Sequence, residues 1–300
     1  MARRVRHEFF DEDFLLRLQR LHLIAKRMAR GSAAGSRRSR RLGDGLEFAD
    51  HRPYAPGDDI RFIDWPYYAR MERLLLRMFH EHSQADVVIL LDVSASMAPG
   101  GAMGKFDFAR RAAAALAYVA MGSLESVTIL AFSDDLGEAM HVGPNRDMIF
   151  GVLDFLAGLA PGGRTDLGRC VEQLTRRRGA EGTLLLLSDL LECEADLSDA
   201  LARPRQYNCD VTVLHVYGPQ DAAPALSGSV LLRQAENAEQ MTVNVTTEVL
   251  ESYRQRWREF QARCERTCVS GGARYVPAAS DLPFDRLVLE TLRRCGVLAG

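Results

Sequence analysis

D-V-V-I-L-L-D-V-S-A-S-M, residues 86–97, is an apolar run that ends abruptly in a carboxylate and two hydroxyls. Residues 87–91 are apolar without alternation, which is typical of a strand in a parallel sheet that helices cover on both faces. In open α/β sheets, ligands bind at the carboxyl ends of the strands. We therefore expect a site at Asp92, Ser94 and Ser96, whose oxygen atoms suit a hard cation such as Mg2+.

The rest of the chain alternates apolar runs with helix-like segments. The pattern predicts strands at 126–132, 136–142, 183–187, 211–217 and 274–276, and a hairpin of 230–232 with 242–245. It predicts helices at 106–121, 145–159, 197–202, 247–268 and 284–294, and a further helix that follows the Gly-rich loop at 160–170 and ends at about residue 178. This order predicts an α/β fold with a doubly wound, mostly parallel sheet. The run at 183–187 also ends in polar residues, Ser188 and Asp189, which repeats the pattern of the opening stretch.

The N-terminal part is predicted to be a helix followed by a basic linker. Apolar residues recur at helical spacing between the carboxylates of residues 11–13 and Gly31, which indicates an amphipathic helix. The next segment, G-S-A-A-G-S-R-R-S-R-R-L-G-D-G, is too polar and flexible to form a core. It either meets an acidic partner or phosphate or is a solvated basic loop. The arginines in question are Arg37, Arg38, Arg40 and Arg41.

Residues 45–70 form a block that is dense in charge and aromatic rings, G-L-E-F-A-D-H-R-P-Y-A-P-G-D-D-I-R-F-I-D-W-P-Y-Y-A-R. Pro56 and Gly57 stand in the order that a type II turn requires, so we expect a hairpin around residues 55–58 and a further strand at 74–79. The charged residues form either an internal ion-pair network or a recognition surface. The candidate partner-binding residues are Arg52, Asp58, Asp59, Arg61, Asp64 and Trp65.

Composition narrows the class of protein. The 300 residues are 47% hydrophobic and carry a net charge of -2, which suits a globular core and argues against a broad nucleic-acid footprint. Lys26 and Lys105 are the only lysines, so we expect no lysine-dependent chemistry. The six cysteines include no C-x-x-C pair and are expected to be reduced thiols. No signal-peptide core and no apolar run of about 18 residues occurs, so we expect a cytoplasmic protein.

The polar residues at the strand ends resemble a known metal site. A D-x-S-x-S motif after one strand, a loop threonine before a helix and an aspartate after a later strand resemble the metal-ion-dependent adhesion site of von Willebrand factor type A domains. The matching residues are Asp92, Ser94, Ser96, Thr165 and Asp189. The resemblance implies that they hold Mg2+, or another divalent cation such as Mn2+, and that a carboxylate of a protein partner completes its coordination. The alternative is a degenerate remnant of such a site.

The block at residues 45–70 resembles a particular family. A Pro-Gly-Asp-Asp-x-Arg-x-Ile-Asp-Trp signature before a type A strand is similar to the bacterial domain-of-unknown-function 58 family, over roughly residues 10–295. The resemblance implies a partnership with MoxR-type AAA+ ATPases in the assembly or activation of protein complexes. It also implies three segments: a helix and basic linker at 1–43, a β-hairpin block at 44–84 and a type A-like domain at 85–300.

An enzyme is the alternative to this interpretation. A Mg2+-dependent phosphohydrolase of the haloacid dehalogenase type also places an aspartate after its first strand. Here Ser94 replaces the second aspartate of that motif, and no lysine follows Lys105. A phosphate-binding loop before Lys105 has broken spacing, no G-x-S-x-G motif occurs, and His215 is expected to be a core residue. We therefore favour a non-enzymatic interaction module and keep the phosphohydrolase as the alternative.

Overall fold

The computed structural model describes residues 10–31, 42–43, 47–80, 86–98, 104–123, 125–178, 182–191, 193–194, 196–207, 209–235 and 239–294. The chain divides into two compact units, Met1–Ser32 with Ala85–Gly300, and Ala33–Gln84. The arginines of the basic linker and Cys295 lie outside the described residues.

The larger unit is built on a six-stranded sheet with the order β11-β8-β7-β4-β5-β6. The strands are β4 (Asp86–Asp92), β5 (Ser126–Phe132), β6 (Leu136–Val142), β7 (Gly182–Ser188), β8 (Cys209–Tyr217) and β11 (Arg274–Ala279). All neighbours are parallel except β6, which pairs antiparallel with β5 at the edge. The predicted α/β fold with a mostly parallel sheet is confirmed.

Strand β4 lies at the point where the strand order reverses. It pairs with β5 on one side and with β7 on the other, and the chain reaches β7 only after β5 and β6 have been placed on the first side. Connections therefore leave β4 and β7 in opposite directions, and in open α/β sheets ligands bind at the carboxyl ends of the strands at such a point. Asp92 ends β4 and Asp189 follows β7, so both carboxylates lie at this switch point.

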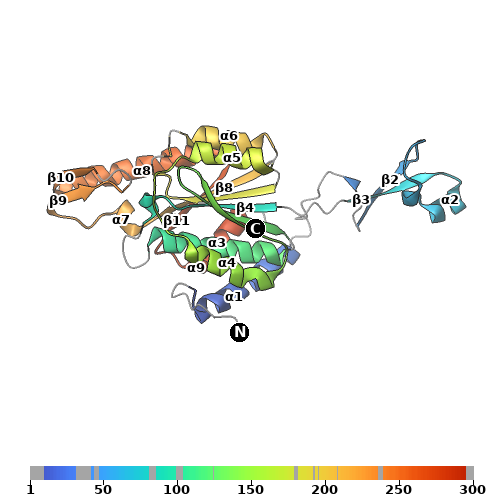
Figure 1. Ribbon diagram of the computed structural model, residues 1–300, viewed down its shortest axis with the longest axis horizontal. Coiled ribbons are helices and arrows are strands. Elements are labelled where there is room, and N and C mark those ends of the chain that lie inside the picture. Colours follow the sequence, from blue (N-terminus) through green and yellow to red (C-terminus); the bar gives the residue numbers. More distant parts are fainter. Residues whose placement is uncertain are drawn as a thin grey trace. The chain divides into compact units, whose positions relative to one another are not determined.

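Helices cover both faces of the sheet (Figure 1). One face carries α1 (Glu12–Gly31), α3 (Lys105–Gly122), α4 (Ile149–Gly158, after the short η3, Arg146–Met148) and α9 (Phe284–Arg294). The other face carries α5 (Leu167–Arg178), α6 (Leu197–Arg205) and α8 (Thr247–Ser270). The apolar side chains of β4 alternate between the two cores, with Ile89 and Leu91 in the first and Leu90 in the second. Burial on both faces explains the uninterrupted apolar run.

Helix α1 is amphipathic, as predicted. Asp11 caps it by accepting a hydrogen bond from the backbone N–H of Phe14 at 2.8 Å. Phe14, Leu18 and Leu21 are buried in the same core as α3 and α9. The helix therefore belongs to the unit that contains the sheet.

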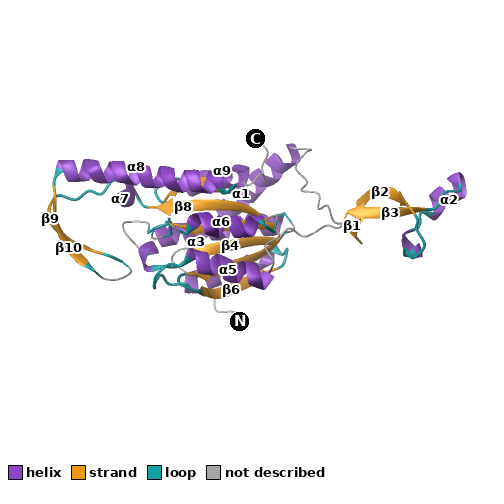
Figure 2. Ribbon diagram, turned by 90° about the horizontal axis from the view of Figure 1, so that it is seen from above, coloured by secondary structure: helices purple, strands orange, loops and turns teal. Residues whose placement is uncertain are grey.

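A two-stranded ribbon follows the short helix α7 (Pro219–Ala222) after β8. Its strands, β9 (Gly228–Arg233) and β10 (Gln240–Val245), are antiparallel, so the predicted hairpin is confirmed. Figure 2 shows the ribbon beside the N-terminal end of α8. The chain thus passes from the carboxyl edge of the sheet through α7 and the ribbon into α8.

The smaller unit is a three-stranded antiparallel sheet with the order β1-β3-β2. The strands are β1 (Leu42–Gly43), β2 (Glu47–Pro53) and β3 (Leu75–His80). The expected turn forms, since Asp58 N donates to Ala55 O at 3.0 Å and Gly57 has the positive φ of 106° that a type II turn needs.

The hairpin predicted around this turn is wrong. The partner of β2 is β3, and the connection between them holds η1 (Ile60–Phe62) and the helix α2 (Trp65–Met71). Asp64 caps α2 by accepting from the backbone N–H of Tyr67 at 2.9 Å, and Pro66 lies in its first turn. Aromatic residues that favour strands elsewhere are thus recruited into a capped helix.

Candidate functional site

The carboxyl ends of β4 and β7 form the core of the site. Leu91 pairs with Leu187, which brings the ends of the two strands level. Ser188 Oγ donates to Asp92 Oδ2 at 2.5 Å, so the two strand ends are joined directly. Asp92, Ser188 and Asp189 are buried.

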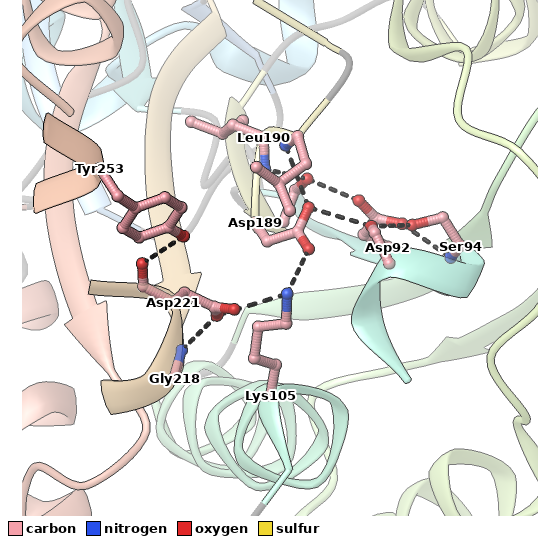
Figure 3. Close-up of polar contacts among 11 residues, drawn as sticks. Asp92, Ser94, Lys105, Asp189, Leu190, Gly218, Asp221 and Tyr253 are labelled. Atoms are coloured by element: carbon pink, nitrogen blue, oxygen red, sulfur yellow. Dashed lines mark hydrogen bonds and ion pairs between the residues drawn. The ribbon is translucent and has the colours of Figure 1, made fainter. Parts of the chain in front are cut away.

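The first motif folds back onto these strand ends. Ser94 N donates to Asp92 Oδ1 at 2.8 Å, and the hydroxyls of Ser94 and Ser96 are 2.9 Å apart. Ser96 Oγ then donates to Asp189 Oδ1 at 3.2 Å. Hydrogen bonds therefore join four of the five predicted metal ligands, Asp92, Ser94, Ser96 and Asp189. Figure 3 labels three of them, Asp92, Ser94 and Asp189.

The fifth predicted ligand, Thr165, lies on a loop that docks beside the first motif. Gly162 N donates to Val93 O at 2.7 Å, and Ala95 N donates to Gly163 O at 3.0 Å. Thr165 is half-buried two residues further on, before α5 begins. The backbone thus holds this loop at the same edge of the sheet as the other four residues.

Lys105 enters the same group of residues, and the sequence analysis missed it. It is the first residue of α3, and its Nζ lies 2.8 Å from Asp189 Oδ2 and 3.4 Å from Asp221 Oδ2. Only 9% of its side chain is exposed. The expectation of no lysine-dependent chemistry stays a prediction, although the fold brings Lys105 to a carboxylate 84 positions away.

Asp221 and Ser188 are two further members of the group. The sequence analysis noted Ser188 only as a polar residue at a strand end and did not name Asp221. Asp221 belongs to α7, and its Oδ2 accepts a hydrogen bond from Gly218 N at 2.7 Å. Its backbone carbonyl accepts from the hydroxyl of Tyr253 on α8 at 2.7 Å. A polar residue directly before Asp189 and an aspartate just after β8 were the available signals, since both follow buried strands.

The backbone after Asp189 is strained in a way that serves the site. Leu190 is buried with a φ of 56°, which is uncommon for a side chain other than glycine. In this conformation Leu190 N donates to Ser188 Oγ at 3.0 Å and Leu191 N donates to Asp189 Oδ1 at 3.1 Å. These bonds fix both side chains against the end of β4.

The negative charges of this group of residues are not fully compensated. Burial and the nearby charge of Asp189 raise the pKa of Asp92 to about 6, although hydrogen bonds from Ser188 and Ser94 oppose the rise. Burial acts against the ammonium group of Lys105, but Asp189 and Asp221 outweigh it and raise the pKa of that lysine. Three carboxylates and one ammonium group leave a formal charge of -2, which a divalent cation would neutralise.

The donor set fits a hard cation. Two carboxylates and three serine hydroxyls take part in these hydrogen bonds, and Mg2+ prefers such oxygen ligands together with retained water. Within the described part of the chain, no group of three or more His, Cys, Asp and Glu residues is arranged to hold a metal ion. A site here would therefore rely on serine hydroxyls, which are weaker ligands than the side chains of dedicated metal cages.

The candidate partner-binding residues of the smaller unit pair with one another. Arg52 binds Asp58 through two hydrogen bonds of 2.7 and 2.6 Å, and Arg61 pairs with Asp59 at 2.6 Å. Asp64 caps α2 and also bonds His51 at 2.9 Å. These contacts form the internal network that the sequence analysis considered, and the side chain of Trp65 remains exposed beside it. Partner binding by this surface stays a prediction.

His215 is a core residue, as predicted. It is buried on β8, its Nδ1 lies 2.6 Å from the hydroxyl of Tyr275, and aromatic rings surround it. Burial lowers its pKa to about 4, so the ring is neutral at physiological pH.

Fold and site together define a class: an α/β protein with a buried, oxygen-rich group of residues at the switch point of a mostly parallel sheet. The chain belongs to the family described as "Protein of unknown function DUF58", whose match spans residues 50–264. Two similar proteins, both uncharacterized, come from Mycobacterium tuberculosis and Mycobacterium bovis. Each is 25% identical over 302 residues, which cover 99% of this chain and 95% of the relative.

Solved structures with a similar fold were also found. BatB from Bacteroides thetaiotaomicron has a TM-score of 0.48 at 18% identity and covers 70% of this chain and 98% of its own. A von Willebrand factor type A protein from Catenulispora acidiphila has a TM-score of 0.42 at 12% identity and covers 74% of this chain and 44% of its own. Among the residues placed by the structure, none of the helices combines the length and apolar character of a membrane span.

Proposed function

We propose that this chain is a non-enzymatic protein-interaction module that binds Mg2+, or another divalent cation such as Mn2+, and through it a carboxylate of a protein partner. The cation would be held by Asp92, Ser94, Ser96, Thr165 and Asp189. When bound, it would supply an open coordination position to which the partner carboxylate binds. The residues of the chain would orient the cation and exclude competing water around it.

One observation carries the proposal. Asp92 and Asp189 are buried at the ends of adjacent parallel strands, and hydrogen bonds of Ser94 and Ser96 connect them. A single ammonium group does not neutralise them, because Asp221 also faces it. Buried charge of this kind costs free energy unless a ligand compensates it, so the arrangement supports a cation site.

Metal binding is tested by isothermal titration of the full chain with MgCl2 and MnCl2. The wild-type protein should bind one cation, and Asp92→Asn should abolish the heat of binding while the far-UV circular dichroism stays unchanged. Glu138→Gln on the exposed edge strand β6 is the matched control and should bind as the wild type does. Equal binding by the wild type and Asp92→Asn would contradict the proposed ligand set.

The proposed partner is a MoxR-type AAA+ ATPase, and the family resemblance supports this assignment. We further propose that the protein acts in the cytoplasm, since its six cysteines include no C-x-x-C pair and the five described ones are buried. Purified ATPase from the same organism should bind the immobilised wild-type chain and should bind Asp92→Asn at least about tenfold more weakly, a loss of about 1.4 kcal/mol. Equal affinity would remove the ATPase as the metal-dependent partner.

The second candidate function is a Mg2+-dependent phosphohydrolase, which the position of Lys105 favours. An ammonium group beside two aspartates would suit a developing phosphate charge. Against it, both oxygens of Asp92 already accept hydrogen bonds, and Ser94 stands where the general acid would be needed. Turnover of p-nitrophenyl phosphate with Mg2+ that is lost in Asp92→Asn would establish the enzyme and overturn the interaction module.

A further inference from the structure

We infer that Lys105 is an internal cation that competes with the divalent metal for Asp189, and that metal binding transfers its ammonium group to Asp221. The inference rests on the metal site proposed above. It assigns Lys105 and Asp221 a role in setting the affinity of that site, although neither residue is among its predicted ligands.

The ammonium group of Lys105 lies between two carboxylates. Lys105 Nζ lies 2.8 Å from Asp189 Oδ2 and 3.4 Å from Asp221 Oδ2 (Figure 3). Asp221 is fixed in place, because its Oδ2 accepts a hydrogen bond from Gly218 N and its backbone carbonyl accepts one from the hydroxyl of Tyr253. A small rotation of the lysine side chain is therefore enough to exchange the shorter contact for the longer one.

Asp189 cannot coordinate the metal ion while its present hydrogen bonds persist. Its Oδ1 accepts from Ser96 Oγ and Leu191 N, and its Oδ2 accepts from Lys105 Nζ. A cation bound at Asp92 and Asp189 would also lie within a few ångströms of the ammonium group and repel it in a site of low dielectric. The lysine must therefore leave Asp189 when the metal arrives.

The position of Lys105 in its helix points to the same role. It is the first residue of α3, where the partial positive charge of the helix N-terminus disfavours a cation. Burial adds a desolvation cost, because only 9% of the side chain is exposed. The carboxylates of Asp189 and Asp221 offset both costs, so the ammonium group depends on these two carboxylates for its stability in this position.

The wild-type chain offers a direct observation, because Lys26 and Lys105 are its only lysines. Protein labelled with lysine carrying 13C at Cε should give two side-chain signals, and Lys26→Arg identifies the one from Lys105. Saturating MgCl2 should shift the Lys105 signal and leave the Lys26 signal in place. Heat of Mg2+ binding without any change of the Lys105 signal would overturn the inference.

A double-mutant cycle separates direct competition from the general effect of charge. Lys105→Met should bind Mg2+ about tenfold more tightly than the wild type or better, within the usual range of coupling between two sites. Asp221→Asn should weaken Mg2+ binding in the wild-type background but should have no effect in the Lys105→Met background, since its role is to receive the ammonium group. The same loss in both backgrounds would show a through-space effect of the Asp221 charge and would overturn the transfer.

Controls keep the outcomes distinct. Lys105→Gln removes the charge but keeps a hydrogen-bond donor for Asp189, so it replaces Lys105→Met if the latter does not fold; both are checked by circular dichroism. Equal Mg2+ affinity of the wild type and the charge-free variant overturns the inference and leaves the proposed metal site standing. If neither protein binds Mg2+ or Mn2+, the proposed metal site and this inference fail together.

Discussion

The substitution Asp92→Asn should stabilise the metal-free protein while it abolishes metal binding. The wild-type carboxyl has a pKa of about 6 instead of its ordinary 3.8. Each pH unit of that difference corresponds to about 1.4 kcal/mol, so ionised Asp92 lowers the free energy of unfolding by about 3 kcal/mol at neutral pH. An amide carries no charge, and its oxygen and NH2 group can still bond Ser94 N and Ser188 Oγ. The variant should recover most of this free energy.

The pH dependence follows from the direction of the shift. A carboxyl with a higher pKa in the folded state binds its proton more tightly there than in the unfolded chain. The penalty is therefore complete above pH 6 and is relieved as the pH falls from about 6 towards 3.8. Between about pH 7.5 and about pH 5, the metal-free wild type should gain about 1 kcal/mol relative to Asp92→Asn.

Urea unfolding followed by circular dichroism measures both effects. The titrations are done with EDTA and with excess Mg2+, and Mg2+ at a hundredfold excess over its Kd should stabilise the wild type by about 2.7 kcal/mol and leave the variant unchanged. Glu138→Gln, an exposed carboxylate on β6, should alter the free energy of unfolding by less than about 0.5 kcal/mol in every condition. Asp92→Ala should be less stable than Asp92→Asn, because it leaves Ser94 N and Ser188 Oγ without their acceptor.

The result that would refute this reasoning is a clear loss of stability. If Asp92→Asn in EDTA at about pH 7.5 is less stable than the wild type by more than about 1 kcal/mol, the charge of Asp92 is already compensated without metal. The site would then be a structural network of hydrogen bonds, and the case for a cation would lose its electrostatic basis.

Three further expectations concern the surroundings of the site, the sheet and the thiols. Ser188→Ala removes the hydroxyl that favours ionised Asp92. Mg2+ titrations at several pH values should therefore show weaker binding, and the pH at which binding is half-maximal should rise. Gly182→Ala places a Cβ against the carbonyl of the neighbouring strand β4 at a φ of 111°, and urea unfolding should show a loss of about 1–3 kcal/mol, whereas Gly143→Ala meets open space and should be nearly neutral. The folded variant Cys295→Ser should not react with Ellman's reagent, because its five cysteine side chains are buried. They should react once the protein is unfolded.

The framework of the fold was predictable because it depends on local pattern. The uninterrupted apolar runs at β4 and β7 exist because helices cover both faces of the sheet, so burial and sequence carry the same information. The helix α2 was missed for the opposite reason, since its Trp and Tyr residues favour strands. The signal that outweighed this preference was present in the sequence, an aspartate cap at Asp64 followed by Pro66 in the first turn.

The strand pattern alone predicted two of the carboxylates of the site, because they follow buried strands. Asp92 and Asp189 satisfy that rule, and parallel pairing of their strands makes them neighbours. Lys105 does not, because it begins a helix and reaches Asp189 only through the packing of α3 on the sheet. A pairing across 84 positions has no periodicity or motif that the sequence alone can reveal.

Lys105 also decides between the two candidate functions, because each requires the opposite outcome from its removal. If the protein is a phosphohydrolase, the ammonium group stabilises the reacting phosphate, and Lys105→Met should lower the turnover of p-nitrophenyl phosphate by about a hundredfold or more. If the protein is a metal-dependent interaction module, the same group opposes the cation, so Lys105→Met should strengthen Mg2+ binding and partner binding together. Titration calorimetry and a phosphatase assay on this one variant, with Lys26→Met as the matched control, therefore separate an enzyme from a docking site. Tighter Mg2+ binding without turnover in either protein would support the docking site, and turnover by the wild type that is lost in Lys105→Met would support the enzyme.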